Sequence, residues 1–399
     1  MHHHVKVTAP KPFEPSLKLK SILSAMIFIG VLVFVIGLMT DAQRTWHAYL
    51  AGLFYFTSLA LVALFYVSIQ FLTKAGWSVL VRRLFESFTA FLPAAGVLTA
   101  LMALFGGKTL YTWLNPDYVL QDALLQHKQS YLNPTFFGVR IALFFGAWIL
   151  FQKLIVGSSL LQDKNGDKNI VNSIVPKCVA YIVFFALSYS LFTVDVIMSL
   201  DPHWFSTIFG VYLFGGTSQA FFALVILMAI YLSKAGFYNG LVNENHIHDL
   251  SKFMLGFTVF WAYIAFSQFM LIWYANMPEE TIFFKHRMEG AWALASVMLM
   301  ILKFVVPFLA LLPRWTKRDY NFLTVICVLI LITQYVDLHW LIYPNFNDHE
   351  YLMSFWEIGI FAGFAGGFGL IVTRFLSQNS LVPMNDPFLQ ESADHQVVY

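Results

Sequence analysis

Residues 21–40 read SILSAMIFIGVLVFVIGLMT, a run of twenty residues without a charged side chain. A helix needs about 20 mainly apolar residues to cross the hydrocarbon core of a bilayer. Nine further runs of this kind follow along the chain. The ten runs lie at about 21–40, 46–72, 87–105, 134–157, 176–200, 206–232, 251–276, 290–312, 320–342 and 353–377. The sequence therefore predicts an all-α integral membrane protein with about ten transmembrane helices.

The composition excludes most other classes of protein. Of the 399 residues, 59% are apolar and 12% are charged, whereas about 25% of a soluble domain is charged. Mean hydropathy is +0.68, which excludes a disordered chain and a soluble enzyme. Two cysteines inside apolar runs exclude a disulfide scaffold, and a net charge of +2 gives no support to nucleic-acid binding.

The distribution of lysine and arginine predicts the orientation. Sixteen of the 24 lie in the terminal segments and in every second loop, five lie in the alternate loops, and three lie within predicted helices. Positive residues collect on the cytoplasmic side, so we expect both termini there. The expected organisation is a cytoplasmic segment 1–20, a membrane domain 21–377 and an extended cytoplasmic tail 378–399. The histidine run at 2–4 is assigned no chemistry.

A first polar stripe lies on the fifth predicted helix. Tyr181, Ser188 and Asp195 recur every seven residues and so share one helix face. A carboxylate within the membrane is costly and is a functional candidate by default. Hydroxyls, carboxylates and water can carry protons along such a stripe. The alternative is a structural carboxylate that accepts a hydrogen bond from a hydroxyl on a neighbouring helix.

A second stripe lies on the eighth predicted helix and consists of Glu289, Ser296 and Lys303. Fourteen residues separate its two charges, about 21 Å along a helix axis, so they do not pair with each other. One interpretation makes the stripe a second proton path. The other lets the Lys303 side chain extend to the inner membrane interface.

Asp337 and His339 lie near the outer end of the ninth helix and complete the set of proton-path candidates. Asp337 and Asp195 both follow valine and both lie near the outer end of their helix, which suggests a weak internal repeat. The outer segments also carry many titratable groups beside tryptophans. Most of these fit a solvated surface, but Asp195, His203 and Asp337 are also candidates for binding a quinol headgroup.

Several motifs are missing or point to structure. There is no CxxC pair for a thiolate metal site, and only His47 and His339 fall within predicted spans, so no metal or haem ligation is expected in this chain. We expect His246 and His248 on a loop surface. Gly359, Gly363 and Gly367 form a ridge of small residues typical of helix packing.

Two longer segments carry a resemblance. SLDPHWFSTIFG at 199–210 and FSQFMLIWYANMPEET at 266–281, with the ten-helix layout, resemble the NrfD-like superfamily (polysulfide-reductase membrane subunits). Within it the chain is most similar to the ActF type, the second NrfD-like subunit of bacterial alternative complex III. The resemblance covers about 20–377. It matches Asp195, the turn at 201–204 and the acidic segment at 278–280, and gives no role to Lys303 or His339.

The resemblance implies two four-helix bundles plus two extra helices, in the bacterial inner membrane. It implies a subunit of a quinol-oxidising respiratory complex without a ligated cofactor of its own. Expected partners are a sister NrfD-like membrane subunit, periplasmic iron–sulfur and multihaem c-type cytochrome subunits, a terminal oxidase as a direct acceptor, and lipids. Whether this chain itself binds quinol stays open. The alternatives are a stand-alone secondary transporter and the membrane anchor of a molybdopterin-type reductase.

Overall fold

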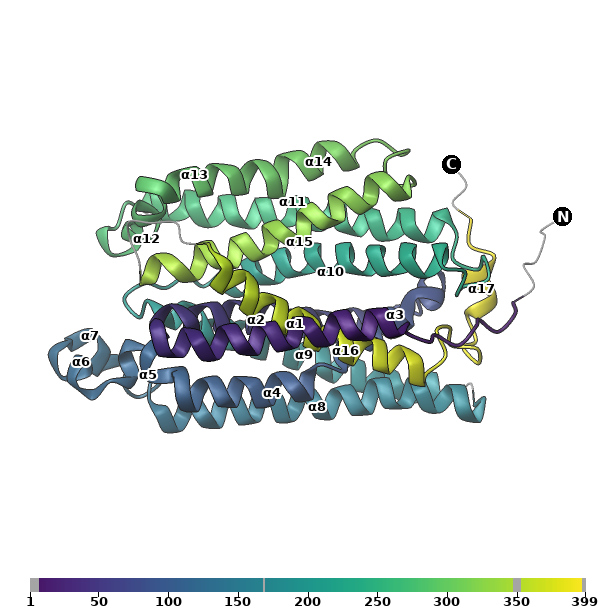
Figure 1. Cartoon of the computed structure of the whole chain (residues 1–399), viewed down its shortest axis with the longest axis horizontal. Helices are drawn as coiled ribbons and strands as arrows, with labels where there is room; N and C mark the ends of the chain where they lie inside the picture. Colours follow the sequence, from purple (N-terminus) through teal and green to yellow (C-terminus); the bar gives the residue numbers. More distant parts are fainter. Residues whose placement is uncertain (1–6, 168, 347–352, 397–399) are drawn as a thin grey trace.

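The computed structural model describes residues 7–167, 169–346 and 353–396. All regular structure in these ranges is helical, and ten helical spans are long and apolar enough to cross a membrane, side by side as Figure 1 shows. The prediction of an all-α chain with about ten such helices is confirmed. The spans are α1 (Leu17–Thr40), α2 (Ala42–Leu72), Gly76–Leu110, α8 (Pro134–Asn165), α9 (Ile170–Val196, extended to Leu200), α10 (Phe209–Lys234), α11 (Glu244–Ala275), Gly290–Leu311, α15 (Tyr320–Ile342, extended to Asn345) and α16 (Phe355–Gln378).

Polar side chains set where many of these helices begin. The side chains of Asp41, Asn133, Asn243 and Asp319 accept hydrogen bonds from the first free backbone N–H groups of α2, α8, α11 and α15. Ser354 caps α16 in a capping box with Glu357. These caps satisfy backbone donors at the helix ends, where the chain turns back toward the bundle.

The third and eighth spans are not continuous α-helices. The third consists of α3 (Val79–Thr89), α4 (Leu92–Leu101), a π-helical segment (Met102–Gly106) and α5 (Gly107–Leu110). The eighth consists of α13 (Gly290–Leu299), a π-helical segment (Met300–Val305) and α14 (Val306–Leu311). Because a π-turn closes i to i+5 bonds, it shifts the helix face after it. Residues on either side of such a segment do not keep heptad register.

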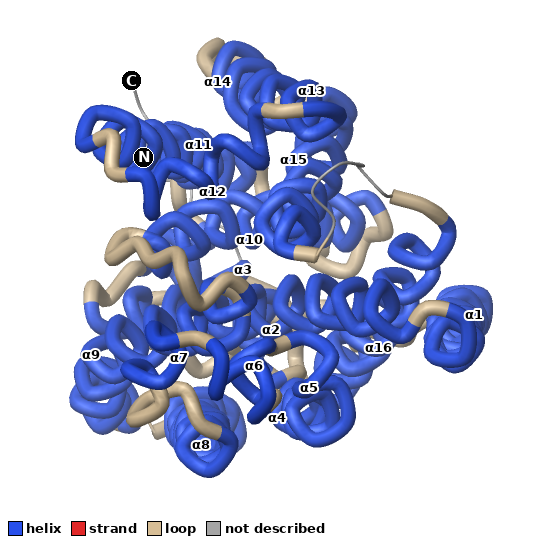
Figure 2. The backbone as a smooth tube through the Cα atoms, turned by 90° about the vertical axis from the view of Figure 1, so that its left-hand side faces the viewer, coloured by secondary structure: helices blue, strands red, loops and turns tan. Residues whose placement is uncertain are grey.

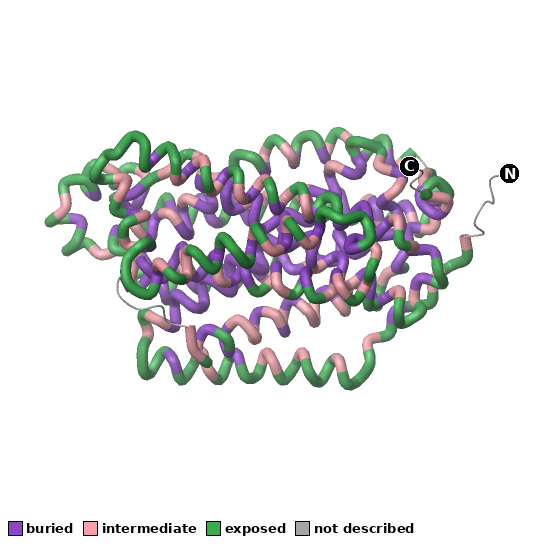
Figure 3. Tube along the Cα trace, turned by 90° about the horizontal axis from the view of Figure 1, so that it is seen from above, coloured by how far each residue is buried: buried purple, intermediate pink, exposed green. Residues whose placement is uncertain are grey.

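Two spans form the interior of the bundle. Over the apolar window of each helix, 94% of residues are buried in α2 and 78% in α10, against 11% in α1. Figure 2 shows α2 and α10 surrounded by the other spans in the end-on view, and buried residues concentrate along the middle of the molecule in Figure 3. The outer helices expose apolar side chains such as Leu104, Val139 and Leu187, as expected for surfaces that face lipid.

The glycine ridge predicted on α16 packs against α1, but with a different third member. A Cβ on Gly30 would lie 2.3 Å from Cα of Gly363, and one on Gly359 would lie 2.8 Å from Cγ2 of Val33. No atom would contact a Cβ on Gly367, whereas one on Gly366 would lie 2.6 Å from the Leu23 carbonyl oxygen. The backbones of α1 and α16 therefore approach closely because these positions lack side chains.

The C-terminal segment is packed on the bundle, contrary to the expectation of an extended tail. The segment before α1 and the short helix α17 (Leu389–Ala393) lie at the same end of the molecule, here called the terminal end; the opposite end is the loop end (Figure 1). Val382 and Ser392 are fully buried. The Ser392 hydroxyl donates to the Trp77 carbonyl at 2.9 Å, and its carbonyl oxygen lies 3.0 Å from Nε2 of His246. The tail covers helix ends that would otherwise expose backbone.

Candidate functional site

The fourth and fifth spans are joined by a buried ion pair. On α9, the Asp195 carboxylate accepts hydrogen bonds from Nε of Arg140 at 2.8 Å and from Nη2 at 3.0 Å. Arg140 lies on α8, and the two residues are 6% and 1% exposed. The alternative for Asp195 named a hydroxyl on a neighbouring helix; the partner on the neighbouring helix is a guanidinium, and the hydroxyl near the carboxylate, that of Tyr131, belongs to the loop before α8. A bidentate pair of this kind is strong and geometrically specific.

Aromatic groups surround the guanidinium. It lies 3.9 Å from the centre of the Tyr131 ring and 4.4 Å from that of Phe136, and it donates to the Tyr131 carbonyl at 2.9 Å. Tyr131 belongs to the loop before α8, where burial raises the pKa of its phenol to about 12. The loop and both helices thus hold Arg140 in one orientation.

The three members of the first stripe share a buried face, as predicted, but each has a different partner. Tyr181 donates to the Leu61 carbonyl of α2 at 3.1 Å, and Ser188 accepts a hydrogen bond from Nε1 of Trp148 at 2.9 Å. Asp195 binds Arg140. Among the described contacts no hydrogen bond joins one of the three to another, so the stripe is a row of separately held groups.

A second buried ion pair joins the eighth and ninth spans. The Lys303 ammonium pairs with the carboxylate of Asp337 on α15 and lies 2.6 Å from Oε1 of Gln334. Tyr212 of α10 donates its hydroxyl proton to the same carboxylate. The indole ring of Trp261 lies beneath the ammonium, 4.5 Å from Nζ to its centre. Lys303 and Asp337 are 0% and 1% exposed, so the expectation that Lys303 extends to the interface is wrong.

The second stripe does not exist as a continuous face. Glu289 is exposed between α12 (Pro278–Met288) and α13. Ser296 is half-buried and accepts a hydrogen bond from Nε1 of Trp340 at 2.7 Å. Lys303 lies within the π-helical segment, which shifts its direction relative to Ser296. Only Lys303 of the three joins the buried cluster.

The two pairs occupy equivalent places in the order of spans. In each, a cation on one span binds an aspartate on the next span, the fourth and fifth in one case and the eighth and ninth in the other. The predicted repeat rested on the two aspartates alone. The structure adds a matching cation to each of them.

His339 and His203 lie elsewhere. His339 lies two residues after Asp337 on α15 and is fully buried. Its imidazole ring stacks on the ring of Tyr343, with ring centres 3.6 Å apart. His203 has a side chain 56% exposed at the loop end, with Nε2 2.6 Å from Oδ2 of Asp122. His203, Asp195 and Asp337 thus belong to three separate sets of contacts, and a common quinol site built from them stays a prediction.

A cavity of about 300 Å³ lies beside the second ion pair, between α10, α11, α12, α13 and α15. Its wall includes Tyr212, which bonds to Asp337, and Trp261, which lies under Lys303. Gln268 also lines it, and its amide oxygen is buried with no hydrogen-bond partner among the described residues. The cavity is therefore mostly apolar with a few polar groups near a protonatable cluster.

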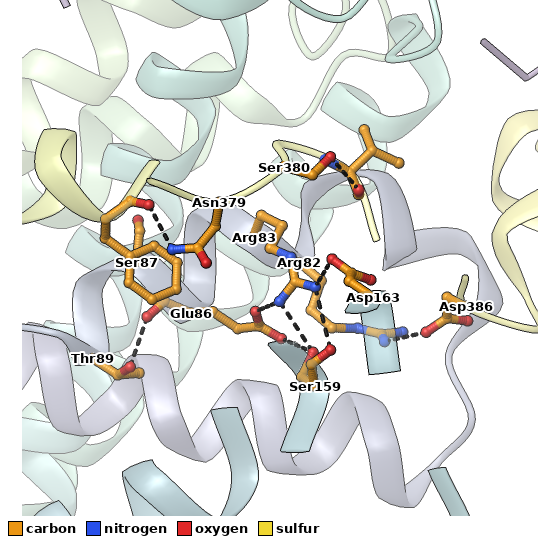
Figure 4. A network of polar contacts seen from close by, with 12 residues as sticks. Arg82, Arg83, Glu86, Ser87, Thr89, Ser159, Asp163, Asn379, Ser380 and Asp386 are labelled. Atoms are coloured by element: carbon orange, nitrogen blue, oxygen red, sulfur yellow. Dashed lines mark hydrogen bonds and ion pairs between the residues drawn. The ribbon is translucent and has the colours of Figure 1, made fainter. Parts of the chain in front are cut away.

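The sequence analysis missed a cluster of charges at the terminal end, drawn in Figure 4. Arg83 is fully buried and pairs with both Glu86 and Asp163. The Ser159 hydroxyl donates to Glu86 at 2.7 Å. Next to this cluster, Arg82 pairs with Asp386 of the C-terminal segment at 2.5 Å. The third run was predicted to start at residue 87 because a hydropathy window excludes charges, so Arg82 and Arg83 were assigned to a loop.

Other charged groups expected at a solvated surface are buried as well. Glu357 is fully buried and pairs with Arg44 at 2.6 Å. Arg287 is 2% exposed and donates to backbone carbonyls, including that of Leu341 at 2.9 Å. His246 and His248 are both buried on α11, so the expectation of a loop surface is wrong for both. Two further titratable residues of the outer segments, His349 and Glu350, lie outside the described residues, as does the histidine run at 2–4.

Within the described ranges, no group of three or more metal-ligating side chains is close enough to hold a metal ion. No known family model matches the chain, and a search of curated proteins gives no match. The chemistry that the site can perform is therefore argued from its own groups. These are two carboxylates held against cations inside a membrane-spanning bundle.

Proposed function

We propose that the chain is an integral membrane subunit of a quinol-oxidising respiratory complex of the alternative complex III type, and that it carries protons through its second ion pair. The observation that carries the proton role is the Lys303–Asp337 pair, buried between two membrane-spanning segments and bonded to Tyr212 and Gln334. Intramembrane ionisable groups of this kind mark proton relays. The role in the complex rests on the resemblance of 199–210 and 266–281.

The chemistry of the two cations favours this pair over Asp195. An arginine stays protonated inside proteins, whereas a buried lysine changes its protonation state readily. Arg140 therefore holds Asp195 ionised, while Lys303 and Asp337 can exchange one proton between them without leaving a net buried charge. The roles first expected of Tyr181, Ser188, Asp195, Ser296 and His339 stay predictions.

A row of buried polar groups supports a path through the interior. They lie on α2, α9 and α10, where Tyr66 faces Ser218 and Tyr189 faces Ser58, without a hydrogen bond of good geometry among the described contacts. Buried polar groups of this kind are commonly bridged by ordered water, and water joined to hydroxyls conducts protons. The atoms are the hydroxyl oxygens of Thr57, Ser58, Tyr66, Tyr189 and Ser218 and the amide oxygen of Gln70.

The packing of the loop end also fits the proposal. Trp204, within 199–210, stacks on Phe283, two residues beyond 266–281, with ring centres 3.9 Å apart and planes 12° from parallel. The first of the two segments that carry the resemblance thus packs against residues that directly follow the second, at the loop end. In the proposed orientation this end faces the periplasm, where iron–sulfur and multihaem c-type subunits would bind, beside a sister NrfD-like subunit. The two four-helix bundles of the family would be α2 to α9 and α10 to α15, with α1 and α16 as extra helices.

The experiment is purification from native membranes in mild detergent through a tag on this chain, followed by a reduced-minus-oxidised visible spectrum. We expect a c-type haem signal that copurifies with quinol oxidation. A colourless protein that purifies without partners would overturn the proposal and favour a secondary transporter. Copurification of a molybdopterin subunit in place of c-type haem would favour the reductase anchor.

A second function, quinol binding by this chain, is favoured by the cavity beside Tyr212, Trp261 and Gln268. A quinol ring placed there would stack on aromatic side chains and lie near Asp337 through Tyr212. Replacing Gln268 by Leu should weaken quinol binding, read as an increase in KM for quinol with little change in stability. An unchanged KM would argue against this site.

A further inference from the structure

A groove of about 840 Å³ lies along one side of the bundle. Its walls come from α1 and α16 on one side and from α2, α10 and α15 on the other. It arises because α16 packs on α1, α2 and α3, whereas α15 packs on α10 and α2. On α16 it runs from Ile358 to Leu376, about 27 Å at 1.5 Å per residue.

The lining is almost entirely hydrocarbon, and most of its hydroxyls are already used. Tyr55 donates to the Leu331 carbonyl at 3.1 Å, Tyr335 donates to that of Glu357 at 3.2 Å, and Thr373 donates to that of Leu370 at 3.0 Å. The fourth lining hydroxyl, that of Tyr231, is exposed and has no hydrogen bond among the described contacts, so it is a donor that a ligand could use. The remainder of the groove is hydrocarbon. It suits an unbranched or branched hydrocarbon chain.

Positive charge surrounds the terminal end of the groove. Lys18 and Lys20 flank the lining residue Leu19, and Arg374 follows the lining residue Thr373. Lys234 lies two residues beyond the lining residue Leu232, and Lys11 lies two residues before Phe13. All five cations are exposed, and Glu14 is the acid next to them in sequence. Basic pockets between helices at the membrane surface bind anionic lipid headgroups.

We propose that this groove binds an anionic phospholipid, with an acyl chain along α16 and the phosphate among Lys18, Lys20 and Arg374. The inference is independent of the respiratory role. The five exposed cations at the terminal end of the groove favour an anionic headgroup over a zwitterionic one.

The test is native mass spectrometry of the full chain in mild detergent, exchanged against phosphatidylglycerol and phosphatidylethanolamine with identical chains. We expect one phosphatidylglycerol to be retained in preference. The triple variant K18Q/K20Q/R374Q should lower that retention about fivefold for each cation removed. The matched control K74Q/K153Q/K164Q, which removes exposed cations outside the lining, should leave it unchanged.

A second variant tests the groove itself. Ala365 lines it, so Ala365→Phe should displace the acyl chain while the cations remain. Ala142 is exposed on α8 outside the lining, so Ala142→Phe is the control of equal size. Equal retention of the two lipids, equal loss in the control variants, or recovery of a quinone in place of phospholipid would each overturn the proposal.

Discussion

Arg140–Asp195 and Lys303–Asp337 are built on the same plan but differ in their cations. The first is a bidentate guanidinium–carboxylate pair backed by two aromatic rings. The second is an ammonium shared between a carboxylate and an amide oxygen, with a tyrosine hydroxyl on the other side of the carboxylate. The guanidinium keeps its proton under all physiological conditions, whereas the ammonium can release one. Under the proposed function we therefore expect a structural role for the first pair and an exchangeable proton in the second.

The largest effect is expected for Asp337→Asn. This change leaves Lys303 buried without a counter-ion, and breaking a buried pair in this way costs about 3–5 kcal/mol of stability. We also expect loss of proton release per quinol oxidised in proteoliposomes. The thermal midpoint in detergent reports the first effect, and the double variant K303M/D337L should recover stability without recovering proton release. If the single variant keeps normal proton release, the second pair is not on the path.

Asp195→Asn tests the first ion pair in the same way. It leaves the Arg140 guanidinium buried without a counter-ion, so the thermal midpoint should fall. The loss of stability should be at most about 3–5 kcal/mol. Arg140 keeps its contact with the Tyr131 carbonyl, which reduces the loss. In enzyme that remains folded, proton release per quinol should be near the wild-type value. A selective loss of proton release would reverse the two assignments.

Conservative exchange of the cations should have smaller effects on stability. Arg140→Lys keeps the charge but loses the bidentate geometry, and we expect a cost of about 1–2 kcal/mol and normal proton release. Lys303→Arg keeps the charge but removes the exchangeable proton, so proton release should stop. The two variants are compared by thermal midpoint and proton release in the same preparation. Equal proton release in both would contradict the proposed difference.

The smallest effect is expected at the exposed pair Asp122–His203, which serves as a solvent-accessible reference for the buried pairs. The Leu125 N–H, and next the His203 side chain, hold the pKa of Asp122 below its ordinary value of 3.8. A lowered carboxyl pKa stabilises the fold above the unfolded-state value, and this stabilisation is lost as the pH falls through the folded value. Asp122→Asn should therefore lower the thermal midpoint slightly at pH 6, with a difference that shrinks as the pH falls below the ordinary carboxyl value of 3.8. A difference that grows at low pH would show the opposite sign.

The residues that sequence reasoning found and those that it missed differ for a physical reason. Asp195 and Asp337 were identified because a charge in an apolar run is costly and rare. Arg140 and Asp195 lie at similar distances from the loop-end termini of their helices. A comparison of their depths in the membrane would therefore have identified them as a pair. Lys303 and Asp337 differ by about eight residues in depth, roughly 12 Å for parallel helices. Figure 1 shows that α15 runs obliquely to its neighbours, which brings the two together.

The burial of charged residues at the helix ends was also not predicted from the sequence. Arg83 and Glu86 lie before the predicted third span, and Glu357 lies near the start of the predicted tenth span, where a solvated surface was expected, although all three are buried. Arg83 pairs with Asp163 and Glu357 pairs with Arg44, and both partners are far away in the chain. Glu86 pairs with Arg83 on its own helix. The burial of such a charged side chain depends on its ion-pair partner, so it cannot be predicted from the neighbouring residues in the sequence.

The amino-acid sequence was enough to predict the number and approximate positions of the membrane-spanning helices, because the length of an apolar run must match the thickness of the bilayer. It also determined which carboxylates are costly to place there. Only the tertiary structure decided the partner of each carboxylate, the shifted face at Met300–Val305, and the packing of the C-terminal segment over the helix ends. These features depend on helix tilt, on backbone hydrogen-bond register and on contacts between residues remote in sequence, and none of these has a periodic signature along the chain.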